Sequence, residues 1–132
     1  MSLGPKLEDL EELLYRQVHP SWLQAGRPTS QAFRPTPKDS GFLSVSRGAV
    51  TNPEAAFLLH TEKKGLSSAG VWSVTVGDCA EAERDVYSDR VEEPVPDPAH
   101  AVVDFRGLAE SKAKAISQQL RAKATCEFLD QR

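Results

Sequence analysis

Proline limits where regular secondary structure can form in this chain. Of its nine prolines, three fall within 26–41, in a stretch rich in Ser and Thr, and three more fall within 94–98. Proline fixes its own φ and lacks the N–H that helices and sheets use, so neither stretch can hold a long element. The sequence therefore predicts a long loop over 26–41 and a rigid, extended loop at 94–98.

Alternation of residue types predicts the strands between these loops. Apolar residues alternate with hydroxyl residues at 42–46 and at 71–76, as half-buried strands require. A short strand is expected at 15–18, a compact one at 101–105 and an irregular edge strand at 85–91.

Spacing and capping patterns predict the helices. Leucines separated by Asp and Glu indicate an amphipathic helix over 6–14, and Pro53 with Glu54 in the first turn indicates one that runs to His60. Asp78 and Glu81 form a capping pattern for a short helix through Ala82. The remaining helical segments are expected at 21–24, as a single turn, and at 108–124, with one apolar stripe.

These elements mix without strict alternation of strand and helix, which favours an α+β fold: a mixed or antiparallel sheet with helices packed on it. A chain of 132 residues is of ordinary size for one domain, so we expect a single domain over 1–132. Residues 1–5 could be disordered at its start.

Composition excludes several classes of function. No run approaches the roughly 20 apolar residues of a membrane helix, and the net charge of -3 gives no general attraction to nucleic acid. Cys79 and Cys126 are far apart and lack metal-ligand spacing, so we expect free thiols, no metal site and a soluble cytoplasmic protein. A disulfide between them stays open on spacing alone.

The segment 15–47 concentrates groups that could bind an anion. Arginine and lysine donors alternate there with shorter polar side chains, a mixture suited to a phosphate or carboxylate. The alternative is a polar surface loop whose side chains satisfy local backbone groups. A long structureless stretch in a compact domain is more often functional, so we predict ligand binding by Tyr15, Arg16, His19, Arg27, Ser30, Gln31, Arg34, Lys38, Asp39 and Ser44.

Catalytic signatures are weak. Neither a Walker loop nor a GxGxxG sequence occurs, and the three histidines match no metal-ligand spacing, so a structural role is the simpler interpretation of each. His19, at the end of an expected strand, is the best candidate for proton transfer. A triad of Ser30, His19 and Asp39 can be assembled, but no nucleophile-elbow pattern supports it.

Several blocks resemble known families. At YRQVHP, SQAFRPTPKDSGFLSV, GVWSVTV and PDPAHAVVDF the chain resembles a family of small bacterial proteins of uncharacterised activity. A more limited resemblance links Arg16, the Gly26-Arg27 pair, LSVS and the Pro-Glu-Ala that starts at Pro53 to RES-type and ADP-ribosyltransferase-like folds. That resemblance implies that Arg16 and Arg27 contact NAD phosphates and that Glu54 is the helix carboxylate, although Pro28 replaces the expected aromatic residue.

Two functional hypotheses follow. The first is an intracellular bacterial accessory or interaction module, without a cofactor, that binds a protein or a small anionic ligand through the 15–47 surface. The second is an NAD-handling enzyme of the RES or ADP-ribosyltransferase-like kind, with His19 and Glu54 as catalytic candidates. Whether the chain is an enzyme stays open at this point.

Overall fold

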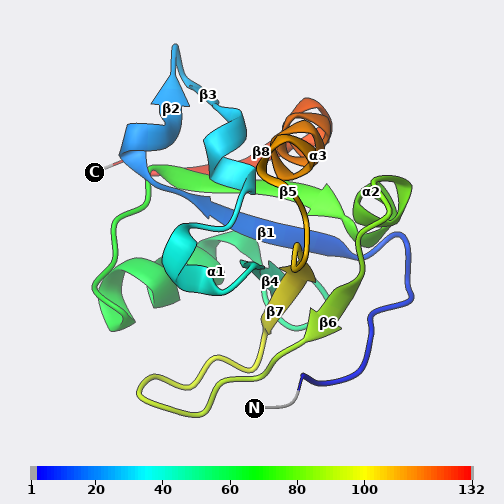
Figure 1. Ribbon diagram of the computed structural model, residues 1–132. Helices are drawn as coiled ribbons and strands as arrows, with labels where there is room; N and C mark the ends of the chain where they lie inside the picture. Colours follow the sequence, from blue (N-terminus) through cyan, green and yellow to red (C-terminus); the bar gives the residue numbers. More distant parts are fainter. Residues whose placement is uncertain (1–2, 132) are drawn as a thin grey trace.

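The protein folds around a six-stranded sheet with helices on both faces (Figure 1). A computed structural model describes residues 3–131. The strand order is β6-β7-β4-β1-β5-β8, and every neighbouring pair is antiparallel. The predicted α+β class is confirmed. The strands of this sheet are β1 (Leu13–Val18), β4 (Phe42–Arg47), β5 (Gly70–Thr75), β6 (Val86–Ser88), β7 (His100–Asp104) and β8 (Thr125–Leu129).

A small hairpin and several helices complete the fold. The strands β2 (Leu23–Gln24) and β3 (Arg27–Pro28) pair with each other and project from the main sheet (Figure 1). The longer helices are α1 (Pro53–Leu58), continued by a π-helical turn (Leu59–Lys63), α2 (Val76–Glu81) and α3 (Glu110–Lys123). Short 3-10 helices span Pro20–Trp22, Ser30–Phe33 and Pro37–Asp39. None of the helices within residues 3–131 is long and apolar enough to cross a membrane.

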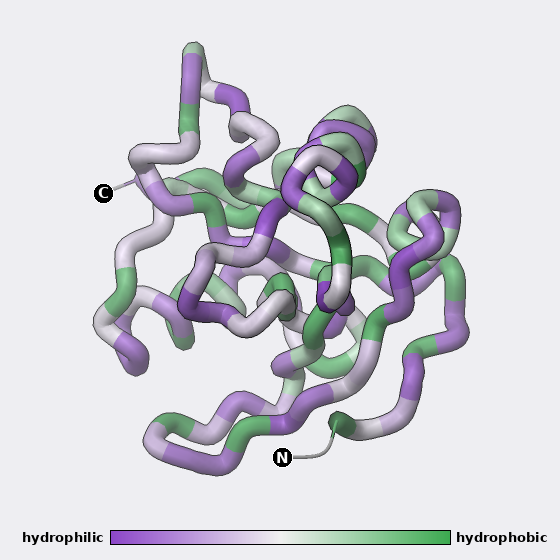
Figure 2. The backbone as a smooth tube through the Cα atoms, in the orientation of Figure 1, coloured by the Kyte–Doolittle hydropathy of each residue, from purple (hydrophilic) through white to green (hydrophobic). Residues whose placement is uncertain are grey.

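The two faces of the sheet bury different cores, because successive side chains of a strand point to opposite sides. On β1, Leu14 packs in the larger cluster with Ile116 and Leu120 of α3. The next residue, Tyr15, packs on the other face with Phe57 of α1. Figure 2 shows hydrophobic residues recurring along the central strands, interspersed with hydrophilic ones.

Most of the predicted elements are confirmed. Strands occupy 13–18, 42–47, 70–75 and 100–104, within two residues of the predicted bounds. Asn52 caps α1, because its side chain accepts a hydrogen bond from the Ala55 N–H, and Pro53 takes the first helical position.

The helix predicted over 6–14 is wrong, because residues 4–7 lie extended along edge strand β6. The Gly4 N–H donates to the Ser88 carbonyl and the Leu7 N–H to the Val86 carbonyl, each at 2.8 Å. Leu7 is buried, whereas Leu10 is 58% exposed, so the leucines do not share one face. Hydrogen bonds to the open edge of the sheet stabilise the backbone of this segment more than the hydrogen bonds of a short helix would. Residues 1 and 2 lie outside the described residues, so the predicted disorder over 1–5 is tested only from residue 3.

The segment 26–41 is not the structureless loop that the prolines predicted. It contains β3 and two 3-10 helices, and Phe33 within it is fully buried. Two side chains of α3 hold it in place: Ser117 Oγ donates to the Phe33 carbonyl at 3.0 Å, and Arg121 Nε donates to the Pro28 carbonyl at 2.6 Å. Proline excluded long elements but allowed short turns, which side chains from elsewhere then stabilise.

Two further details correct the sequence analysis. The helix α2 begins at Val76, two residues before the proposed cap, and its capping box is formed by Thr75 and Asp78 rather than Asp78 and Glu81. The edge strand β8 was not predicted at all. It starts two residues after α3 and pairs with β5.

Candidate functional site

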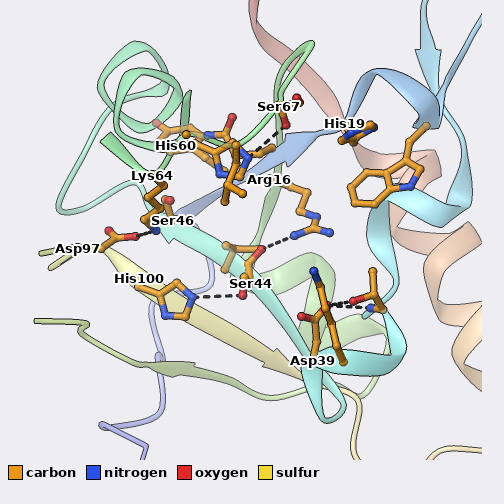
Figure 3. A pocket seen from close by; sticks show the side chains of 18 residues that line it. Arg16, His19, Asp39, Ser44, Ser46, His60, Lys64, Ser67, Asp97 and His100 are labelled. Atoms are coloured by element: carbon orange, nitrogen blue, oxygen red, sulfur yellow. Dashed lines mark hydrogen bonds and ion pairs between the residues drawn. The ribbon is translucent and has the colours of Figure 1, made fainter. Parts of the chain in front are cut away.

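A cavity of about 490 Å³ lies where β1 and β4 separate (Figure 3). The two strands pair only at Leu14↔Arg47 and Tyr15↔Ser46, whereas β1 pairs with β5 along all six of its residues. Beyond those two pairs, Arg16 of β1 and Ser44 of β4 line the cavity from opposite sides. Beyond that point the two strands no longer satisfy each other's backbone N–H and C=O groups, so other donors and acceptors must do so.

The Arg16 side chain connects neighbouring segments at the opening between β1 and β4. Its Nη1 donates to the Ser44 carbonyl at 3.0 Å and its Nε to the Ala32 carbonyl at 2.7 Å, so the side chain supplies donors where the β1–β4 ladder stops. The guanidinium also lies 5.3 Å from the ring centre of Trp22. Burial lowers the pKa of Arg16 to about 10, and the charge of Asp39 opposes this shift. The side chain therefore remains cationic at neutral pH.

The charged side chains that line the cavity together give it a net positive charge. Lys38 is exposed and forms no ion pair within residues 3–131. Lys64 Nζ lies 2.7 Å from Asp97 Oδ2, and Asp39 Oδ2 accepts hydrogen bonds from the N–H and hydroxyl of Thr36. Three cations and two carboxylates thus line the cavity. With neutral imidazoles its net charge is +1, although the whole chain carries -3.

All three histidines of the chain line this one cavity, although they are far apart in sequence (Figure 3). His19 Nδ1 accepts a hydrogen bond from the Ser21 N–H, and His60 Nε2 lies 3.3 Å from the Ser67 carbonyl. His100 contacts Ser44 and Asp89. In the described part of the chain, no three His, Cys, Asp or Glu side chains lie close enough together to hold a metal ion.

The structure brings six of the ten predicted ligand-binding residues to the cavity: Tyr15, Arg16, His19, Lys38, Asp39 and Ser44. The other four, Arg27, Ser30, Gln31 and Arg34, do not line it, nor does the catalytic candidate Glu54. Arg27 is exposed on the β2–β3 hairpin, and Ser30 and Gln31 lie on the 3-10 helix that packs against α3. Glu54 is exposed in the first turn of α1.

The sequence analysis missed the part of the cavity wall that lies outside 15–47. His60, Lys64 and Ser67 come from the π-helical turn and the loop after it, and Asp97 and His100 from the second proline loop and the start of β7. Asp97 is 2% exposed, and its Oδ1 has no hydrogen-bond partner among the described residues. A carboxylate in a stretch of prolines was the only local signal for this part of the site.

His60 should make the stability of the protein depend on pH. Burial lowers its pKa from 6.5 to about 4, and the nearby Lys64 and Arg16 charges act in the same direction, against the Ser67 carbonyl and Asp97. The unfolded chain therefore binds a proton more readily than the folded one, and stability falls as the pH drops from about 6.5 towards 4. We expect the urea midpoint of His60→Gln to fall less than that of the wild type between pH 7 and pH 5. Equal falls would contradict this assignment.

Comparison of the chain with protein-family models, with curated proteins and with solved structures found no match.

Proposed function

We propose that the chain binds a small ligand bearing a phosphate or carboxylate group in the cavity between β1 and β4. Arg16 carries the proposal. Two of its nitrogens are fixed by backbone carbonyls, whereas Nη2 has no hydrogen-bond partner within residues 3–131. A guanidinium held in this way has lost its side-chain freedom before the ligand arrives, and its remaining N–H groups fit the oxygens of an oxyanion.

The size and charge of the cavity support the same ligand class. Ligand pockets commonly occupy about 300 to 1,000 Å³, and this cavity of about 490 Å³ falls within that range. Lys38 at its rim has no carboxylate partner among the described residues, so its ammonium is free to meet an incoming anion. The local positive charge would attract such a ligand despite the negative charge of the chain.

NAD remains an alternative ligand, because its pyrophosphate presents the same chemistry to Arg16. The resemblance to ADP-ribosyltransferase-like folds also assigned Arg27 and Glu54, and neither lines the cavity. We therefore propose no catalytic role for Glu54 and treat NAD as one of the probes. A protein partner, the other expectation, would have to present an acidic side chain to the same cations.

We expect the module to act in the cytoplasm of a bacterial cell, and the free thiols of Cys79 and Cys126 support this location.

Calorimetric titration tests the proposal. We expect saturable binding of at least one of three probes, inorganic phosphate, malonate or NAD, together with a rise in the melting temperature. Release of nicotinamide from NAD would favour the enzymatic alternative. If none of the three binds, the proposal fails.

Two substitutions locate the binding site. Arg16→Gln should weaken binding of the successful probe by about 10- to 100-fold, because a charge-assisted hydrogen bond contributes about 1.5 to 3 kcal/mol. Since Arg16 also bonds the Ala32 and Ser44 carbonyls, this variant could lose stability, so Lys38→Gln is the second test. It removes no ion pair and should weaken binding by about 10-fold. The matched control is Arg27→Gln, which lies outside the cavity and should bind as the wild type does; an equal loss in this control would contradict the placement of the site.

A further inference from the structure

Ser44, His100 and Asp89 form a continuous polar series at one wall of the cavity, in which the His100 ring bonds the Ser44 hydroxyl on one side and the Asp89 backbone carbonyl on the other. Ser44 Oγ lies 3.2 Å from His100 Nε2 (Figure 3). On the other side of the ring, His100 Nδ1 lies 2.9 Å from the Asp89 carbonyl and 3.2 Å from Asp89 Oδ2. Ser44 and His100 line the cavity, whereas Asp89 does not line it and has a side chain that is only 13% exposed.

The partners of the ring determine where its proton lies. Both neighbours of Nδ1 are oxygen acceptors of Asp89, so Nδ1 must carry the hydrogen. In the neutral ring Nε2 then has a free lone pair, which accepts the hydrogen bond from the Ser44 hydroxyl. The serine therefore donates to a base whose tautomer is fixed by the Asp89 backbone carbonyl, with the Asp89 carboxylate 3.2 Å from the same nitrogen.

We infer that Ser44 is a nucleophile for small carboxylic esters, with His100 as its general base and Asp89 as the positioning residue. The nucleophile–base distance of 3.2 Å and the base–carboxylate contact match the roles that such a series requires. The triad considered from sequence, Ser30, His19 and Asp39, shares none of these residues. Of its members, Ser30 does not line the cavity.

The reaction balances without a cofactor. Ser44 Oγ bonds to the carbonyl carbon of the ester while its proton passes to His100 Nε2, and the carbonyl electrons move to the carbonyl oxygen. When those electrons return, the bond to the alkoxide breaks, and the leaving alcohol takes the proton from His100. Water then attacks the acyl-enzyme with His100 again as base, which releases the acid and restores Ser44.

Arg16 supplies positive charge next to this nucleophile. Its Nη1 is fixed on the backbone carbonyl of Ser44 itself, and both residues line the cavity. A fixed cation beside the reacting centre stabilises the negative charge that develops on the carbonyl oxygen. The same anchoring keeps Ser44 at the open part of the β1–β4 boundary, where a substrate can reach it.

Covalent labelling tests the assignment independently of anion binding. Incubation of the full chain with diisopropyl fluorophosphate should form a bond between Ser44 Oγ and phosphorus and release fluoride, and peptide mapping should place the adduct on Ser44. Ser44→Ala should abolish the adduct, and His100→Gln should slow its formation by at least about 100-fold. The control is Ser46→Ala on the same face of β4. Ser46 lies opposite His100 in the β4–β7 ladder, but within residues 3–131 its hydroxyl bonds no imidazole, so this variant should be labelled at the wild-type rate.

Rescue by a conservative variant separates positioning by Asp89 from a purely structural role. Asp89→Asn removes the carboxylate that lies 3.2 Å from His100 Nδ1 and should slow labelling by at least about 10-fold. Asp89→Glu keeps a carboxylate beside the ring and should recover part of the rate. An unlabelled wild type, an adduct on another residue, or labelling that survives His100→Gln would each overturn the inference.

Discussion

Glu12→Ala should lower the free energy of unfolding by about 3 kcal/mol. Glu12 is 8% exposed, and both of its carboxylate oxygens bind Arg47: Nε donates to Oε2 at 2.8 Å and Nη2 to Oε1 at 3.0 Å. Removing the carboxylate leaves the guanidinium without its partner, and this loss is the main cost when a buried pair is broken. The Arg47 side chain is 25% exposed, so water recovers part of the loss and the effect stays at the low end of the usual range.

Urea unfolding of three variants checks this expectation. Glu11→Ala is the matched control, because Glu11 is exposed and its side chain forms no hydrogen bond or ion pair within residues 3–131, so the stability of this variant should change by less than about 0.5 kcal/mol. Arg47→Ala and the double variant complete a thermodynamic cycle that isolates the pair. If Glu12→Ala and Glu11→Ala cost the same, the ion pair contributes nothing and the account of this end of β1 is wrong.

Glu12 also illustrates why the N-terminal segment was mispredicted. Alternating leucine and acidic residues over 6–14 fit a helix, but Arg47, the partner of Glu12, lies 35 residues away and belongs to β4. The partner of Leu7 in the backbone is Val86 of the edge strand. Neither contact can be inferred from the periodicity of a short segment. The local pattern therefore predicted a helix, whereas pairing with distant residues makes the chain extended.

The strands and helices that were predicted correctly depend on local chemistry. Alternation is strong in β5, and a cap followed by proline marks the start of α1. The strand β8 lacks such a signal, because most of its residues are exposed and it is stabilised mainly by pairing with β5. Local patterns therefore sufficed for the central elements and failed at both ends of the chain.

The candidate site also has one part that the local sequence predicted and one part that it did not. The part between Tyr15 and Ser44 was recognised because its polar groups are close in sequence. The part formed by His60, Lys64 and Asp97 was missed, because only the folding of the sheet brings these residues to Arg16. Spacing along the chain also argued against a joint role for the histidines, whereas the structure places all three around one cavity.

Phe33→Ala should cost about 3 to 5 kcal/mol of stability, the usual range when a buried phenylalanine is truncated. Phe33 is fully buried in the larger core cluster, although it lies in the segment that the prolines predicted to be a loop. Its carbonyl also accepts the hydrogen bond from Ser117 of α3. Truncation would leave a cavity between the 3-10 helix and α3, and a marginally stable domain has little free energy to spare.

Phe33→Ala should also weaken ligand binding in the cavity, so a second measurement can check this prediction. Ala32, next to Phe33, accepts the hydrogen bond from Arg16 Nε at 2.7 Å, so a loosened 3-10 helix releases one of the two anchors of the guanidinium. We expect weaker binding of the successful anionic probe well below the melting temperature, where the variant is still folded. Gln31→Ala is the control, since Gln31 is exposed on the same 3-10 helix and should change neither stability nor affinity. A Phe33→Ala variant that is destabilised but binds as tightly as the wild type would show that Arg16 does not depend on this anchor.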